Sequence, residues 1–186
     1  IMVPFCRTVE EGKNVRAKMK EYGLDEGDVD VYVMAELPAN IIGAESFSDV
    51  FDGFSIGTND LTQTTLGVDR NSDKLKDLFD ERDEAVMESV STLIEKAHRK
   101  GRHVGICGDA PSTHDEYAPF LVEEGIDAIS VSPDVALETI LKVAEAEENR
   151  DSKVPVQVGE SFSKKDVGDA AGEIYDTLNK HGSAKA

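Results

Sequence analysis

The feature that most constrains the fold is a repeated alternation of short apolar runs with amphipathic segments. The five apolar runs, rich in Val and Ile, span residues 1–6, 29–37, 50–56, 103–107 and 126–131. Between them lie polar loops and segments such as 83–100, where apolar residues fall on one face of a helix. Strands that alternate with amphipathic helices predict a parallel sheet with helical crossovers.

Capping signals place the predicted helices along the chain. Thr8 and Glu11 predict a capping box for a first helix that Gly23 ends. Pro38 predicts the first position of a short helix after the second strand, and Gly101 predicts the end of helix 83–100.

The second half of the chain carries similar signals. Thr113 and Glu116 predict another capping box, and Ser132-Pro133 predicts the start of a helix that runs to about Glu147. A polar linker follows, and a last helix is predicted over residues 163–180. We therefore predict a sheet-containing domain over residues 1–149 and a linker, helix and loose tail over 150–186.

Two α/β architectures fit this pattern, an open doubly wound sheet and a barrel of eight strand–helix units. A barrel typically takes about 250 residues, whereas this chain has 186 residues and five predicted strands. The sequence therefore predicts either a small open sheet or the C-terminal part of a barrel.

Charge excludes several classes of function. Lys and Arg total 20 and Asp and Glu total 38, for a net charge of −18, which is the wrong sign for an electrostatic binder of nucleic acid or anionic membranes. No apolar run reaches the length of a membrane span. The first residues show no basic leader, which predicts a cytoplasmic protein. The acidic surface fits an ordinary cytosolic protein or a high-salt milieu, and the sequence leaves this open.

Acidic residues follow the second and third predicted strands, where parallel α/β folds build their active sites. Glu36 ends the run VYVMAEL and Asp60 follows FSIGTN. Carboxylates at strand ends are suitable ligands for Mg²⁺. The alternative is that each acid caps the following helix or faces solvent.

A more specific group of residues is Gly57-Thr58-Asn59 before Asp60. Glycine allows close approach of the backbone to a ligand, and successive N–H groups then meet an anion. Asn59 adds amide donors, and Arg70 adds a bidentate clamp for phosphate or carboxylate. A simple Gly-Thr-Asn turn is an equally good interpretation from spacing alone.

Two cysteines without CxxC spacing exclude a disulfide scaffold or zinc ribbon. Cys6 is interpreted as a small buried hydrophobic residue. Cys107 admits the same interpretation, but its place before Gly108 at a strand end also suits a reactive thiol. The four histidines show no metal-ligand spacing.

Four motifs together resemble one enzyme family. They are MVPFCRTVEEG, VMAELPAN, FSIGTNDLTQTTLGVDR and GICGDAPS, in that order. They are similar to the C-terminal phosphoenolpyruvate (PEP)-binding domain of the PEP-utilising enzymes, the family of PEP synthase (pyruvate, water dikinase), pyruvate phosphate dikinase and phosphotransferase enzyme I. The likeness covers about residues 1–147, and Arg7-Thr8 after MVPF favours the synthase branch, as does Ala110-Pro111-Ser112.

The resemblance implies an α/β fold in which these strands form the final five units of a TIM-type (β/α)8 barrel. It implies that Glu36 and Asp60 coordinate Mg²⁺ and that Cys107 is the proton donor and acceptor. The residues implied to bind PEP or pyruvate are Asn59, Arg70, Gly57, Thr58 and Gly108.

The implied chemistry is phosphoryl transfer from an enzyme phosphohistidine to the Mg²⁺-stabilised enolate of pyruvate. In the full enzymes ATP, pyruvate and water give AMP, PEP and phosphate, a gluconeogenic reaction that uses N-terminal ATP-binding and phosphohistidine domains as partners. The chain alone is expected to lack that overall activity, and a homodimer is expected from the resemblance. The alternatives are a non-catalytic binding or assembly module, and the equivalent domain of the dikinase or enzyme I.

Overall fold

The computed structural model describes residues 1–24 and 29–151 and divides the chain into two compact units, Ile1–Val131 and Ser132–Ala186. In the second unit, helix α8 (Ala136–Asp151) confirms the helix predicted after Ser132-Pro133. The helix predicted over 163–180 lies outside the described residues. The domain division predicted at residue 149 stays a prediction. None of the described helices is long and apolar enough to cross a membrane.

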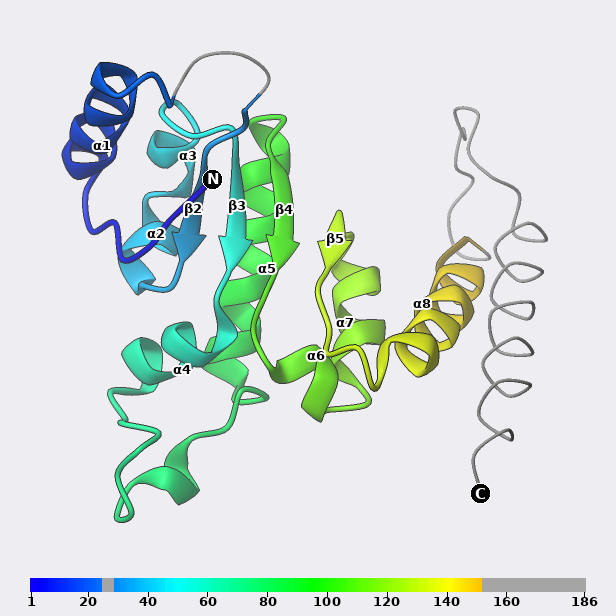
Figure 1. Cartoon of the computed structure of the whole chain (residues 1–186). Coiled ribbons are helices and arrows are strands. Elements are labelled where there is room, and N and C mark those ends of the chain that lie inside the picture. The colour runs from blue at the N-terminus through cyan, green and yellow to red at the C-terminus, as the bar shows by residue number, and fades with distance from the viewer. Residues whose placement is uncertain (25–28, 152–186) are drawn as a thin grey trace, which may run out of the picture. The chain divides into compact units, whose positions relative to one another are not determined.

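The first unit contains one five-stranded sheet in which every neighbouring pair is parallel (Figure 1). Its strands lie within the five predicted apolar runs, as β1 (Met2–Val3), β2 (Tyr32–Ala35), β3 (Gly53–Ile56), β4 (His103–Ile106) and β5 (Ala128–Ile129). The strand order follows the chain order, as in a TIM-type barrel, whereas a doubly wound sheet reverses direction partway. The α/β prediction is confirmed, and the sheet has the topology of part of a TIM-type barrel.

Helices fill the crossovers between the strands. They are α1 (Val9–Glu21), α2 (Pro38–Ile42), α3 (Ala44–Phe47), α4 (Thr58–Leu66), α5 (Glu84–Arg99), α6 (Ala110–Thr113) and α7 (Tyr117–Glu124), with a 3₁₀ turn η1 (Lys76–Leu78). Pro38 opens α2 as predicted. At α1 the Thr8 hydroxyl accepts from the Glu11 amide at 3.1 Å, but the Glu11 carboxylate accepts from Arg7 rather than from Thr8.

One helix was not predicted, and one predicted cap is wrong. Residues 58–66 form helix α4, although their sequence TNDLTQTTL is rich in Thr, a weak helix former. The capping box predicted from Thr113 and Glu116 does not form. Thr113 is the last residue of α6, where its hydroxyl donates to the Asp109 carbonyl at 3.0 Å. Pro111 near the start of α6 favours this earlier helix, and α7 begins afterwards without a side-chain cap.

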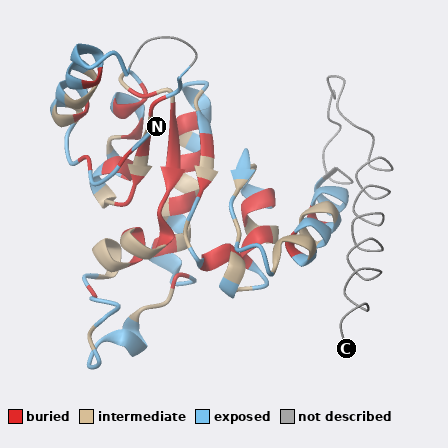
Figure 2. Cartoon of the chain, in the orientation of Figure 1, coloured by how far each residue is buried: buried red, intermediate tan, exposed pale blue. Residues whose placement is uncertain are grey.

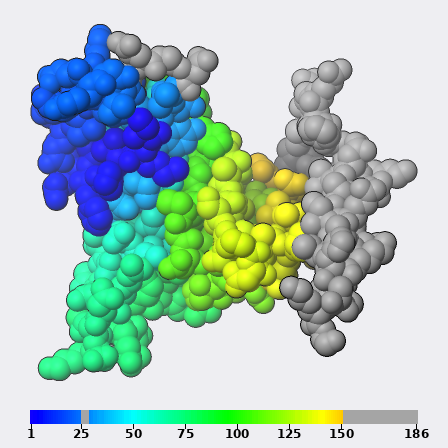
Figure 3. Space-filling model, in the orientation of Figure 1, coloured from blue at the N-terminus to red at the C-terminus, as the bar shows by residue number. Residues whose placement is uncertain are grey.

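The core lies between the sheet and α5, which runs behind β3 and β4 in Figure 1. The apolar helix face predicted from periodicity is buried, with no residue more than 1% exposed. Its residues are Val86, Val90, Leu93, Ile94 and Ala97. Val33, Phe54 and Val104 of the three central strands are fully buried. Figure 2 shows in red that buried residues gather on β3 and along α5. Burying each such side chain contributes about 1.5–3 kcal/mol. In the space-filling view the colours of the first unit run from blue to yellow across one face, as the sequential strand order requires (Figure 3).

Within the first unit, two aspartates link neighbouring strands and helices at the starts of the strands. Asp52, before β3, accepts hydrogen bonds from the Val31 amide and the Arg16 guanidinium, both at 2.8 Å. Asp127, before β5, contacts the Val104 amide at 2.8 Å and the His98 ring at 2.9 Å. Burial opposes ionisation of both carboxyls, but these partners outweigh it and hold each pKa below its usual value.

Replacing Asp52 with Ala is expected to lower the free energy of unfolding by about 2 kcal/mol at pH 7, because the Val31 amide loses its charged partner. A depressed pKa means that the ionised carboxylate stabilises the fold above the ordinary pKa of 3.8. The difference between wild type and variant should therefore shrink as the pH falls below that value. Urea unfolding measures both effects. Asp49→Ala, which removes only an exposed ion pair with Lys100, serves as the control and should cost less than about 1 kcal/mol.

Candidate active site

The residues that follow β1 to β4 meet at one edge of the sheet, because all four strands are parallel. Phe5 follows β1, Glu36 follows β2, Gly57 follows β3 and Cys107 follows β4. All except Phe5 belong to the set implied by the resemblance. Hydrogen bonds and close packing join each of these segments to the next.

Glu36 is held by the segment after β1. The residue is 5% exposed, and its carboxylate accepts a hydrogen bond from the Phe5 amide at 3.0 Å. Phe5 has a φ of 48°, a left-handed conformation that costs a non-glycine residue about 1 kcal/mol. The strained backbone of Phe5 thus carries the amide that orients the Glu36 carboxylate.

Asn40 fixes the backbone on either side of Glu36. Its fully buried side chain accepts hydrogen bonds from the amides of Glu36 and Leu37, at 3.3 and 3.1 Å, and donates to the Cys6 carbonyl at 2.7 Å. The sequence analysis missed Asn40, although an Asn in the first turn of a helix opened by Pro38 is a recognisable capping signal.

Glu36 and Asp60 interact electrostatically. Burial raises the pKa of Glu36, the Phe5 amide opposes that rise, and the charge of Asp60 adds to it. Gly57 packs so closely that a Cβ there would lie 2.9 Å from Glu36 Cγ and 3.1 Å from its Oε1. A side chain at position 57 would therefore crowd the carboxylate.

This pair of acids fits the donor set of Mg²⁺, which commonly takes one or two protein carboxylates and fills its other positions with water and substrate. Asp60 is half-buried in the first turn of α4, and its Oδ1 accepts from Gln63 Nε2 at 3.0 Å. Among the described residues, no group of three or more His, Cys, Asp or Glu side chains is placed to hold a metal ion. The two carboxylates therefore match a site completed by a bound ligand better than a closed structural metal site.

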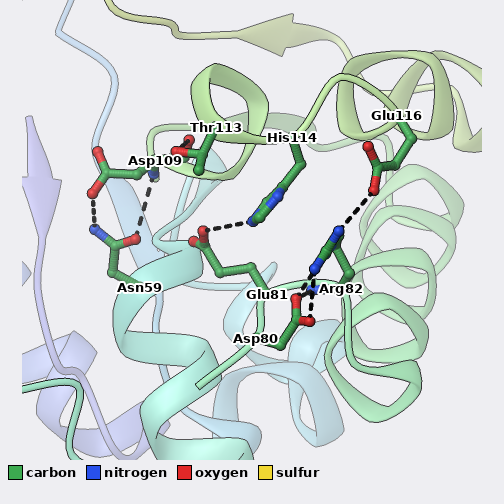
Figure 4. Close-up of polar contacts among 8 residues, drawn as sticks. All are labelled: Asn59, Asp80, Glu81, Arg82, Asp109, Thr113, His114 and Glu116. Carbon is green, nitrogen blue, oxygen red and sulfur yellow. Dashed lines mark hydrogen bonds and ion pairs between the residues drawn. The ribbon is translucent and has the colours of Figure 1, made fainter. Parts of the chain in front are cut away.

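Thr58, Asn59 and Asp60 form the first turn of α4 rather than a free turn. The amides at a helix N-terminus lack intrahelical partners and favour anions. The Asn59 side chain donates to Asp109 Oδ2 at 2.7 Å, and the Asp109 amide lies 3.5 Å from Asn59 Oδ1 (Figure 4). This pair joins α4 to the segment after β4, and the sequence analysis did not single out Asp109.

Cys107 is exposed at the end of β4, so it is not a buried hydrophobic residue. Its amide donates to the Ile56 carbonyl at 2.9 Å, and the Ser55 hydroxyl donates to its Sγ at 3.1 Å. Ser55 was missed, although a serine within the apolar run VFDGFSI is a visible signal. Cys6, by contrast, is 3% exposed as predicted, and its burial raises the pKa of its thiol.

Arg70 lies on the exposed segment after α4, where its amide donates to Gln63 Oε1 at 3.1 Å. Together with Asn59, Glu81, Asp109 and other residues, it lines a pocket of about 370 Å³. Glu36, Asp60 and Cys107 do not line this pocket. A larger hollow of about 640 Å³ is lined by α5 residues and Glu124 and includes none of the predicted residues.

Comparison with known proteins agrees with the geometry. The sequence matches the family profile described as PEP-utilising enzyme, PEP-binding domain, over residues 1–148. It is 56% identical to a phosphoenolpyruvate synthase of Aquifex aeolicus over 149 residues, 55% identical to one of Synechocystis sp. over 148, and 46% identical to one of Escherichia coli over 147. These alignments cover 79%, 78% and 78% of this chain and 17%, 18% and 19% of the relatives. The chain thus spans less than a fifth of the length of these relatives.

Replacing Gly108 with Ala should disturb the site. A Cβ at position 108 would overlap the Thr58 hydroxyl and lie 2.6 Å from the Thr58 amide nitrogen. We expect a loss of about 2 kcal/mol in the free energy of unfolding, because the backbone must shift to relieve the overlap. Urea unfolding measures the change.

Gly105→Ala is the matched control within the same segment. Its added Cβ would lie 3.6 Å from the nearest atoms, both of Ala128, which is an ordinary contact. The control should stay within about 0.5 kcal/mol of wild type. Equal losses in the two variants would contradict the close packing of Gly108 on Thr58.

Proposed function

The chain belongs to the PEP-utilising enzymes, matching their PEP-binding domain, and from this premise we propose that it binds PEP and pyruvate at the carboxyl edge of its sheet. One observation carries the proposal. Adjacent segments after β2, β3 and β4 present an acidic pair, a helix N-terminus with Asn59, and the exposed thiol of Cys107. These are the chemical groups that a small dianionic substrate and its proton transfer require.

Glu36 and Asp60 would hold Mg²⁺ in this proposal. The bound ion supplies Lewis-acid stabilisation of the negative charge that develops on the enolate oxygen. Its positive charge also reconciles anion binding with a chain of net charge −18. The two carboxylates alone would repel the substrate, so substrate affinity should depend on the metal.

Asn59, Arg70 and the amides of Thr58 and its neighbours would hold the substrate anion. The first amides of α4 can donate hydrogen bonds to an anion. Arg70 supplies a guanidinium on an exposed segment, which permits bidentate contact with a phosphate or carboxylate. Gly57 and Gly108 would contribute by leaving room beside these groups.

Cys107 would exchange the proton at the methyl or methylene carbon. As a base its thiolate takes a proton from the methyl group of pyruvate, and as an acid its thiol returns a proton to the methylene carbon of the enolate that PEP leaves when it loses its phosphoryl group in the reverse direction. Either role requires that the thiol be accessible, and Cys107 is exposed to solvent. The Ser55 hydroxyl at 3.1 Å orients the sulfur.

The synthase reaction is the form of this chemistry that the relatives' names favour. In this proposal the phosphoryl group comes from a phosphohistidine on another domain, and ATP, pyruvate and water give AMP, PEP and phosphate overall. This chain would carry out the part of the reaction in which pyruvate forms its enolate and accepts the phosphoryl group. It would not perform the ATP-dependent half alone.

Mg²⁺-dependent binding of oxalate, a planar mimic of the enolate, tests this proposal. We expect saturable binding in isothermal titration calorimetry with Mg²⁺ and none with EDTA. Asp60→Ala should weaken it by more than about 100-fold, since even changes outside the direct ligands of a metal cost 10–100-fold.

Asp73→Ala is the control, because it removes the same charge from an exposed position outside the site. It should bind oxalate as wild type does. Binding that persists in EDTA, or that Asp60→Ala and Asp73→Ala reduce equally, would refute the assigned metal site.

A further inference from the structure

Glu81 is a buried carboxylate to which the proposed function gives no role. It lies before α5, is 4% exposed, and its Oε1 has no hydrogen-bond partner within the described part of the chain. Burial raises its pKa, and the nearby Thr58 hydroxyl and the His114 ring oppose that rise. A buried carboxylate with an unpaired oxygen is costly, so its presence calls for a role at this position.

The neighbours of Glu81 belong to the segments that carry the substrate residues. Thr58, which begins α4, is fully buried, and its hydroxyl has no side-chain or backbone partner among the described residues other than the nearby Glu81 carboxyl, whose pKa it lowers. His114 Nε2, just after α6, lies 3.8 Å from Glu81 Oε2 (Figure 4). Tyr117, which begins α7, is fully buried, and its hydroxyl has no hydrogen-bond partner among residues 1–24 and 29–151; burial and the charge of Glu81 raise its pKa. Glu81 therefore stands between α4 and the α6–α7 segment.

The space around Glu81 suits ordered water. The 370 Å³ pocket reaches Glu81 and His114, and 3.8 Å is too long for a direct hydrogen bond between their side chains. A buried water typically makes about three hydrogen bonds to otherwise unpaired polar groups. Glu81 and His114 both line the pocket, whereas Thr58 and Tyr117 do not, so water in the pocket would bridge the Glu81 carboxylate and the His114 ring.

A second link between the same segments lies at the surface. Arg82 contacts Asp80 at 2.9 Å and Glu116 at 3.3 Å (Figure 4). All three side chains are substantially exposed, so solvent screens this link and its contribution is small. The buried carboxylate of Glu81 is the better placed of the two to hold the segments.

We propose that Glu81 is a positioning residue that fixes the first turn of α4 against the α6–α7 segment, directly and through ordered water. It acts on the site through Thr58, which adjoins Asn59, and through His114, which ends the segment that begins at Cys107. The ligand consequence rests on the proposed function, whereas the fixing of the two segments does not.

Glu81→Leu separates this role from simple space filling. Leucine fills a similar volume and removes the cost of burying a carboxylate, so the global free energy of unfolding should equal or exceed that of wild type. The polar contacts of Glu81 with Thr58 and His114 would nevertheless be lost. In the 186-residue chain, we expect amide hydrogen exchange to accelerate at least tenfold at Leu61, at Cys107 and at residues 112–114, whose amides are hydrogen-bonded, with exchange within α5 unchanged.

Three further variants sharpen the measurement. Glu81→Gln keeps the shape and one acceptor oxygen, so it should restore most of the protection that Glu81→Leu loses. Glu88→Leu, an exposed change on α5, should leave exchange at both segments within twofold of wild type. His114→Leu should accelerate exchange in the same segments, and combining it with Glu81→Leu should add little to either change.

The ligand arm uses Mg²⁺ and oxalate with the same proteins. Glu81→Leu should weaken oxalate binding about tenfold and Glu88→Leu should not. If wild type binds no oxalate, the proposed function fails, and the exchange arm still decides the role of Glu81. Exchange within twofold of wild type at both segments in Glu81→Leu would overturn the proposal. If that variant fails to fold, unchanged exchange in His114→Leu overturns it instead.

Discussion

Parallel pairing of β2, β3 and β4 in a single register is the interaction on which the rest of the structure depends. Ala35 pairs with Ile56, and Ile56 pairs with Ile106. The next residue on each strand is therefore Glu36, Gly57 and Cys107, side by side at one edge. A slip of one residue would move the side chains on each face of a strand to the opposite face, so the apolar packing on α5 also sets the positions of the polar groups.

Contacts between the segments that follow β1 to β4 hold these residues close together in one site. Phe5 holds Glu36, the Thr64 hydroxyl donates to the Glu36 carbonyl at 2.7 Å, and Asn59 pairs with Asp109. Glycines at positions 57 and 108 allow the segments to approach so closely. The arrangement concentrates negative charge, so binding of an anionic substrate would need the positive charge of a metal ion, of Arg70 and of the α4 N-terminus.

Local sequence patterns predicted the sheet and α5, because both depend on the periodic burial of apolar residues. They also predicted that Glu36, Asp60 and Cys107 follow strands. They failed where tertiary contacts decide the outcome. Helix α4 forms despite its threonines, and Asn59 meets an aspartate 50 residues away. Glu81 looked like one more surface acid in a chain with 38 acids, and only folding shows that it is buried among Thr58, His114 and Tyr117.

The central claim is that one edge of the sheet, formed by the segments after β1 to β4, is the ligand site. Amide chemical shifts of the ¹⁵N-labelled chain, recorded while oxalate is added in the presence of Mg²⁺, test it most directly. The account predicts that the largest changes fall at Phe5, Glu36, residues 57–60 and residues 107–109. Changes centred instead on the hollow along α5, or spread evenly over the chain, would contradict it.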